Sequence, residues 1–253
     1  MSSNHKKSIL FIVEGEKGEV NVLKKLTTIL YANNEYKIYP INGSIYELFD
    51  DLKSDEDLDI LLHLKSKAKT DEDREILSKR YNSIYLIFDF APHHHKYKLE
   101  KLKDMLLFFD DALDNGKLLI NYPMLESYRH LKEFPDYEFK DRMIDFSDLN
   151  KYKEIVGKES AYSNLNKYDY NLVMCMLIHH LSKANYILTK QFKTGSLDDF
   201  NSLDQSKYNE ILEIQNKLKN DLGKFYVLNT SIFFLIELKP KSFFRQIKRF
   251  ICY

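Results

Sequence analysis

The sequence contains few of the residues that break or cross-link a chain. Its 253 residues include only 7 glycines, 5 prolines and 2 cysteines, and tryptophan is absent. So few glycines and prolines predict long regular elements with few open loops. Cys175 and Cys252 have neither the spacing of a metal site nor that of a disulfide framework, so both are interpreted as packing or neutral positions.

An excess of charge and long hydrophobic runs are also lacking. The chain has 38 basic and 38 acidic residues, which argues against a protein that coats nucleic acid through bulk electrostatics. Apolar runs such as 231–238 are far below the roughly 18 residues of a membrane span, and the N-terminal MSSNHKKS adjoins no signal peptide. We therefore expect a cytoplasmic protein with no membrane partner, in which local basic patches make any nucleic-acid contacts.

Three apolar runs each end at or just before an acid. The first, SILFIVEGE, is a short β-branched and aromatic run that ends at Glu14, and it predicts a strand buried on both faces of a parallel sheet. A second run, IYLIFDF, ends at Asp89, and a third, LLINY, ends shortly before Glu126. Open α/β sheets bind their ligands at the carboxyl ends of their strands, so these acids are candidate site residues.

The remaining pattern predicts an α/β domain over 1–132 and a mainly helical domain over 133–253. The first domain is expected to have a mainly parallel sheet flanked by helices and a charged helical insertion at about 50–80. The second is expected to end in a basic tail, 239–253, which has five basic residues and no acid. The expected segments are helices at 15–31, 97–109, 169–190, 207–222 and from about 231, and strands at 36–41 and 117–122.

Carboxylates at one sheet edge suit a hard cation. Mg²⁺ typically binds one or two protein carboxylates and keeps waters and substrate phosphate oxygens in its shell. A site built from Glu14, Asp89 and Glu126 would therefore bind Mg²⁺ or Mn²⁺ and perform phosphoryl transfer. A single acid after a strand is more often a helix cap or a surface residue, and only the repetition of the arrangement favours a site.

An apolar strand that runs into Glu-Gly, followed by a later strand that ends in an Asp-x-Asp-like element, resembles the TOPRIM domain of topoisomerases, primases and OLD-family nucleases. The acid-rich GEKGE after Glu14 resembles the compact TOPRIM proteins of bacterial anti-phage systems, including RloB-like proteins and the toxin subunit of PARIS-type systems. The resemblance covers about residues 8–132. It implies that Glu14 is a general acid/base or metal ligand, that Asp89 binds Mg²⁺, and that Glu126 lies near the site.

One position departs from that family pattern. The second aspartate of the motif would fall at residue 91, where this chain has Ala91. Loss of one of two strand-end ligands should weaken metal binding severely. Either the lineage is degenerate, or Ala91 is an engineered replacement that disarms a toxic nuclease, and the sequence leaves both explanations open.

Several basic side chains are candidates for substrate contacts. His93, His94 and His95 follow the Asp89 strand and could contact a phosphate or a metal-bound water, although a polar loop is also an ordinary place for histidine. Arg129 shares a predicted helix with Glu126. His180 and Lys183 share a face of an apolar helix, where a structural role is the alternative.

These features together predict a metal-dependent nuclease that acts on RNA, such as tRNA, as the toxin of an anti-phage defence system. An ATPase sensor protein, or further copies of the chain, would be its protein partners. Two alternatives remain open at this stage. One is a non-catalytic TOPRIM-like module that binds such a sensor, and the other is a phosphatase that acts on a small phosphate ester.

Overall fold

The computed structural model describes residues 7–32, 34–54 and 59–250. The first half of the chain alternates strands with helices, as the apolar pattern predicts. Its elements are β1 (Ser8–Val13), α1 (Gly18–Tyr31), β2 (Glu35–Pro40), α2 (Ile45–Ser54), α3 (Ile60–Lys67), α4 (Asp71–Leu77), β3 (Ser83–Asp89), α5 (Leu99–Phe108), β4 (Asp110–Asp111) and β5 (Gly116–Tyr122).

The central sheet has the strand order β2-β1-β3-β5-β4, and β1, β2, β3 and β5 run parallel. Strand β4 pairs with β5 antiparallel through a turn that ends at Gly116. Gly116 has φ +94°, and a Cβ atom there would lie 2.5 Å from the Leu86 side chain, so only glycine fits this position. The predicted α/β class with a mainly parallel sheet is confirmed.

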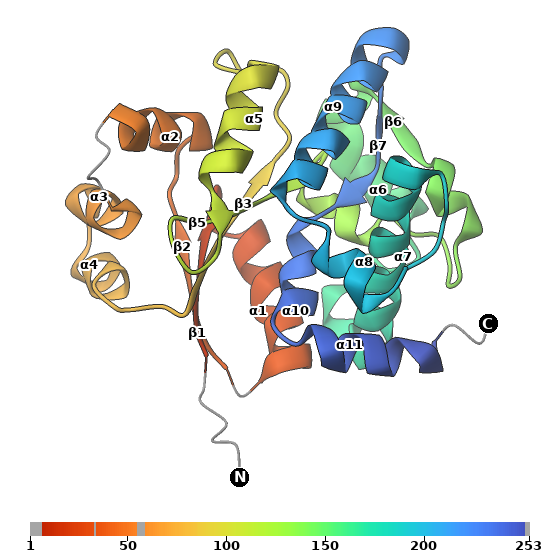
Figure 1. Cartoon of the computed structure of the whole chain (residues 1–253), viewed down its shortest axis with the longest axis horizontal. Coiled ribbons are helices and arrows are strands. Elements are labelled where there is room, and N and C mark those ends of the chain that lie inside the picture. The colour runs from red at the N-terminus through yellow and green to blue at the C-terminus, as the bar shows by residue number, and fades with distance from the viewer. Residues whose placement is uncertain (1–6, 33, 55–58, 251–253) are drawn as a thin grey trace.

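Helices cover both faces of the sheet. Helices α2, α3 and α4 lie on one side, and α1 and α10 lie on the other (Figure 1). On the second face, Phe234 of α10 packs its ring edge-on against Phe11 of β1 at 4.7 Å. Strands β1 and β3 are almost wholly apolar because both of their faces are covered.

The second half is mainly helical, as predicted. Helix α7 confirms the helix expected at 169–190, and α9 confirms the one expected at 207–222. The elements are the 3₁₀ helices η1 (Leu125–Arg129), η2 (Tyr137–Asp141), η3 (Phe146–Lys151), η4 (Leu165–Lys167), η5 (Ser231–Phe233) and η6 (Ile247–Arg249), the α-helices α6 (Tyr152–Glu159), α7 (Tyr170–Thr189), α8 (Leu197–Asn201), α9 (Gln205–Leu222), α10 (Phe234–Glu237) and α11 (Pro240–Gln246), and the strands β6 (Met143–Asp145), β7 (Lys224–Tyr226) and β8 (Leu228–Asn229).

The two halves, which the sequence interpretation treats as domains that meet near residue 132, share one hydrophobic core. Strand β8 from the second half pairs with β5 and extends the sheet of the first. The hydroxyl group of Tyr31 in α1 donates to the carbonyl of Leu235 in α10. Buried apolar residues from both halves form one contiguous cluster.

The charged helical insertion and the basic tail both pack against the rest of the fold. The charged stretch at 50–80 includes α3 and α4, which bury Ile60, Leu64 and Leu77, so these helices are part of the layer over the sheet; residues 55–58 lie outside the described chain. The described part of the basic tail, 239–250, is also anchored, because Phe243 and Ile247 are buried, and residues 251–253 lie outside the described chain. Among the described residues, no helix is both long and apolar enough to cross a membrane.

Candidate functional site

Glu14 and Asp89 lie at the carboxyl ends of neighbouring parallel strands. Val13 of β1 is paired with Ile87 of β3, so Glu14 follows β1 at the same edge where Asp89 ends β3. The chain leaves β1 toward β2 on one side, whereas β3 and β5 lie on the other side. This edge is therefore the topological switch point of the sheet, the usual ligand site of open α/β folds.

Asp89 is the most strongly perturbed acid of this edge. Burial raises its pKa to about 8. A hydrogen bond of 3.0 Å from the Asn121 side-chain amide opposes this shift, and the negative charges of Glu19, Glu14 and Glu126 add to it. Four carboxyl groups from three separate segments thus act on one another at the end of β3, and a bound cation would relieve their repulsion.

Glu14 and Glu19 form the β1 side of this group. Desolvation raises the pKa of Glu14, and the charge of Glu19 raises it further. The Glu19 carboxylate lies over Gly15, where a Cβ atom would approach it to 3.0 Å. Gly15 therefore allows the first turn of α1 to bring a second carboxylate close to the strand end.

Glu126 lies on η1 beyond the end of β5, and its side chain is 15% exposed. Its Oε1 atom is 3.4 Å from Nζ of the exposed Lys153, whereas its Oε2 atom is buried without a hydrogen-bond partner among the described residues. A buried carboxylate oxygen without a donor is costly unless a ligand or a proton satisfies it. The Oε2 atom of Glu126 therefore lacks the donor, proton or ligand that would satisfy it among the described residues.

The acids of this edge do not supply a complete set of metal ligands, so substrate oxygens and water would have to complete the shell of a bound ion. Among the described residues, no three His, Cys, Asp or Glu side chains are placed to hold a metal ion together. The donor type still suits Mg²⁺ or Mn²⁺, since these ions accept one or two carboxylates and complete their shells with phosphate oxygens and water. Glu14 and Asp89 would be those two ligands, and Glu126 would face them.

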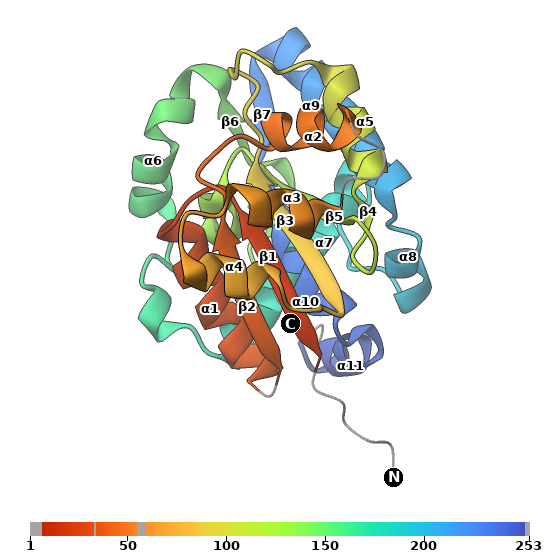
Figure 2. The same ribbon diagram turned by 90° about the vertical axis from the view of Figure 1, so that its left-hand side faces the viewer.

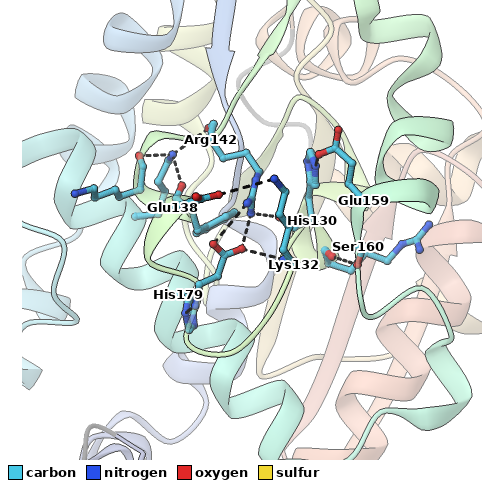
Figure 3. Close-up of polar contacts among 12 residues, drawn as sticks. His130, Lys132, Glu138, Arg142, Glu159, Ser160 and His179 are labelled. Carbon is cyan, nitrogen blue, oxygen red and sulfur yellow. Dashed lines mark hydrogen bonds and ion pairs between the residues drawn. The ribbon is translucent and has the colours of Figure 1, made fainter. Parts of the chain in front are cut away.

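A polar network from the second half supports Glu126. Both Tyr152 and Lys153 come from the start of α6, and the charge of Glu126 is, after burial, the largest influence that raises the pKa of Tyr152. His130 Nε2 lies 3.1 Å from Glu159 Oε2, and both residues are labelled in Figure 3. The Nδ1 atom of His130 is 3.1 Å from the Tyr152 hydroxyl oxygen. Burial lowers the pKa of His130, so the neutral ring donates from Nε2 to Glu159 and accepts the Tyr152 hydroxyl proton at Nδ1.

The loop that follows β3 contains the next group of expected residues. Ala91 lies two residues beyond Asp89, and its carbonyl accepts the backbone N–H of His94 in a tight turn. The ring of His94 stacks on that of Tyr46, whereas His93 is exposed. Arg129 shares η1 with Glu126 and is half-buried, with Nη1 donating to the Ser163 carbonyl over 3.4 Å.

His180 and Lys183 are not in position to contact a substrate, and this corrects the expectation from the sequence. Both side chains have no exposed surface. His180 accepts the N–H of Asn229 at Nδ1 and donates from Nε2 to the Tyr128 carbonyl, and burial lowers its pKa to about 3, so it is neutral.

Lys183 satisfies the carbonyl groups that end η2. Its Nζ atom donates to the carbonyls of Phe139, Lys140 and Arg142, and it lies 4.4 Å from the centre of the Tyr226 ring. Burial lowers the pKa of Lys183 well below its usual range. The Phe139 carbonyl also accepts the backbone N–H of Arg142, and the Arg142 carbonyl also accepts that of Val227, so Lys183 adds donors to a backbone segment that is already hydrogen-bonded and stabilises the fold.

Two residues of the site were not identified from the sequence. Asn121 is paired with Asp89 in the sheet register and donates to it, but an asparagine inside the apolar run LLINY carries no signal until β5 is known to neighbour β3. Lys153 lies in a segment without a recognisable sequence pattern, so nothing there indicated that it contacts Glu126.

A pocket of about 330 Å³ adjoins the same sheet edge beyond β2, and Glu16, Asn42 and Ser44 are among its lining residues.

The comparisons with known proteins leave the function open. No protein-family model and no solved structure matches the chain. An uncharacterized protein of Methanocaldococcus jannaschii is 28% identical over 139 residues, which cover 44% of this chain. The matched region is 43% of the length of that relative.

Proposed function

We propose that this protein is a metal-dependent nuclease of the TOPRIM type, and that it uses Mg²⁺ or Mn²⁺ bound at the carboxyl edge of the sheet. The observation that carries the proposal is the raised pKa of Asp89, at a sheet edge where other carboxylates gather. Its pKa is raised to about 8 within a group of carboxylates at the topological switch point. A concentration of negative charge at a ligand-binding edge is the arrangement expected of a cation site.

The proposed roles follow from the position of each acid. Glu14 and Asp89 would hold the ion, and Glu126, whose buried Oε2 atom has no hydrogen-bond partner among the described residues, would orient the scissile phosphate or an attacking water. Asn121 fixes the orientation of the Asp89 carboxylate. A cation bound here would neutralise charge that develops on the phosphate and lower the pKa of water.

The proposed substrate is RNA, with tRNA as an example, because zero net charge gives little general affinity for long duplex DNA. His93, His94 and Arg129 are the proposed substrate contacts that stay accessible in the structure. As a toxin of an anti-phage system the protein would act in the cytoplasm. An ATPase sensor protein or further copies of the chain would then control it.

Ala91 favours a second candidate function. Position 91 is not an acid, and among the described side chains no three possible metal ligands lie together. A non-catalytic module would also lack a complete metal site. Such a protein would keep the TOPRIM-like fold and act by binding a sensor partner. The pocket beyond β2 leaves room for a third candidate, a phosphatase that acts on a small ester.

A substrate panel separates these functions. The Ala91→Asp protein would be incubated with single-stranded RNA, tRNA, duplex DNA and a nitrophenyl phosphate, each with Mn²⁺ or with EDTA. We expect Mn²⁺-dependent cleavage of RNA and intact phosphomonoester. Release of nitrophenol with intact polymers would indicate the phosphatase, and no reaction with any substrate in the presence of a bound ion would indicate the binding module.

A further inference from the structure

Three aromatic rings form a ladder at the carboxyl edge of the sheet. Tyr46 lies in the first turn of α2, and its ring stacks on His94 with centroids 5.0 Å apart and an interplanar angle of 13°. The His94 ring in turn lies 4.4 Å from that of His95 at an angle of 32°. Tyr46 is buried, His94 is half-buried and His95 is exposed, so the ladder runs from the interior to the surface.

The inner end of this ladder lies close to the acids. The pKa of Tyr46 is raised by burial, then by Tyr97 and by the charge of Glu14. Helix α2, which carries Tyr46, lies at the end of the molecule opposite α11 and the start of β1 (Figure 2). The ladder therefore begins beside Glu14, at the carboxyl end of β1, and extends from there to the surface.

The ladder presents the flat face of an aromatic ring to a ligand, and its rings carry little net charge. Burial and the neighbouring His95 lower the pKa of His94, which leaves its imidazole neutral at pH 7. Lys96 in the same loop is engaged by acids of α2, with Nζ 3.5 Å from Asp50 and 3.9 Å from Glu47. A partner would therefore be recognised here through its flat surface more than through its phosphates.

Unpaired nucleobases have such a surface. Bases in a duplex are covered on both faces by their neighbours, whereas a base in a single strand or a loop can stack on an aromatic side chain. Each such contact contributes about 1–3 kcal/mol, which would compensate for the weak electrostatic attraction of a chain with zero net charge.

We propose that the exposed ring of His95, supported by His94 and Tyr46, stacks an unpaired base of a nucleic acid and thereby places the adjoining phosphate at the carboxylates. The inference rests on the proposed nuclease function and narrows its substrate to unpaired nucleotides. It gives His95 the stacking contact with the base and His94 a supporting role.

The test is binding measured in EDTA, so that no cleavage occurs. Fluorescence anisotropy would compare a 12-nucleotide single-stranded RNA, the same sequence as single-stranded DNA, an abasic version and a blunt duplex. We expect the single strands to bind more tightly than the duplex and the abasic strand. His95→Ala should weaken single-strand binding about tenfold, and His95→Trp should restore it.

His93→Ala is the matched control, because His93 is an exposed histidine of the same loop and is not a ring of the ladder. As a proposed phosphate contact, His93 should contribute equally to the intact and the abasic strand, so His93→Ala should weaken both by the same factor, whereas His95→Ala should weaken only the intact strand. Equal binding by wild type and the His95→Ala protein, or a preference for the duplex, would overturn the inference. The nuclease proposal fails separately, if the Ala91→Asp protein binds single strands through His95 and cleaves none of them.

Discussion

Ala91→Asp is expected to create Mg²⁺-dependent cleavage of RNA, at least about 100-fold above the Ala91 protein, together with toxicity on expression. The replacement adds a ligand and a full negative charge two residues beyond Asp89. Glu14 and Asp89 already lie on neighbouring strands, so the new carboxylate would complete the acid set of the resembled family. The measurement is the initial rate of cleavage with Mg²⁺, after purification under repression.

The double variant Ala91→Asp with Glu14→Ala should lose both the activity and the toxicity. Residues that act as one unit lose nearly the same activity whether one or several are removed. Ala91→Asn is the matched control, because it has the size of aspartate without the charge, and it should stay inactive. An active Ala91→Asn protein, or full activity without Glu14, would show that the cation site is not built from these residues.

Asp89→Asn is expected to raise the free energy of unfolding at pH 8 by several kcal/mol. The pKa of Asp89 is about 8 in the folded protein and 3.8 without perturbation, so the folded state binds the proton more tightly than the unfolded state. The stability that this proton provides is fully present below about pH 4 and is lost as the pH rises to about 8. Asparagine keeps the acceptor for Asn121 and has no charge to bury.

Urea unfolding from pH 4 to pH 9 measures this effect. The difference between Asp89→Asn and wild type should grow by about 1.4 kcal/mol per pH unit between about pH 4 and pH 8, and then level off. Glu138→Gln, a change at a solvent-facing acid of η2, is the control and should show no such trend. A constant difference across this range would mean that Asp89 ionises normally.

The sequence was sufficient for the part of the site that depends on strand ends. Short apolar runs identified β1 and β3, and because parallel strands finish at one edge, the proximity of Glu14 and Asp89 could be predicted. Contacts between segments that are distant in the sequence could not be predicted. Asn121 reaches Asp89 only through the β3–β5 register, and Lys153 reaches Glu126 only after α6 docks on η1.

The sequence interpretation missed what surrounds His180 and Lys183, and it missed the short strands β7 and β8. In both cases the local pattern does not determine the tertiary contacts. Helical periodicity places His180 and Lys183 on one face of α7 but does not say whether that face meets solvent or backbone carbonyls. The apolar segment after residue 224 was expected to turn helical from about residue 231. It does so, but its first residues form β7 and β8, whose two or three residues are too few to show alternation. Strand β8 is also what joins the two halves into one core.

The central claim is that Glu14 and Asp89 bind one divalent cation at the switch point of the sheet. Anomalous diffraction from crystals of the Ala91→Asp protein soaked in Mn²⁺ tests it most directly. The account predicts a manganese peak bonded to carboxylate oxygens of both residues. A saturated crystal with no manganese at this edge, or with the ion held elsewhere in the chain, would contradict it.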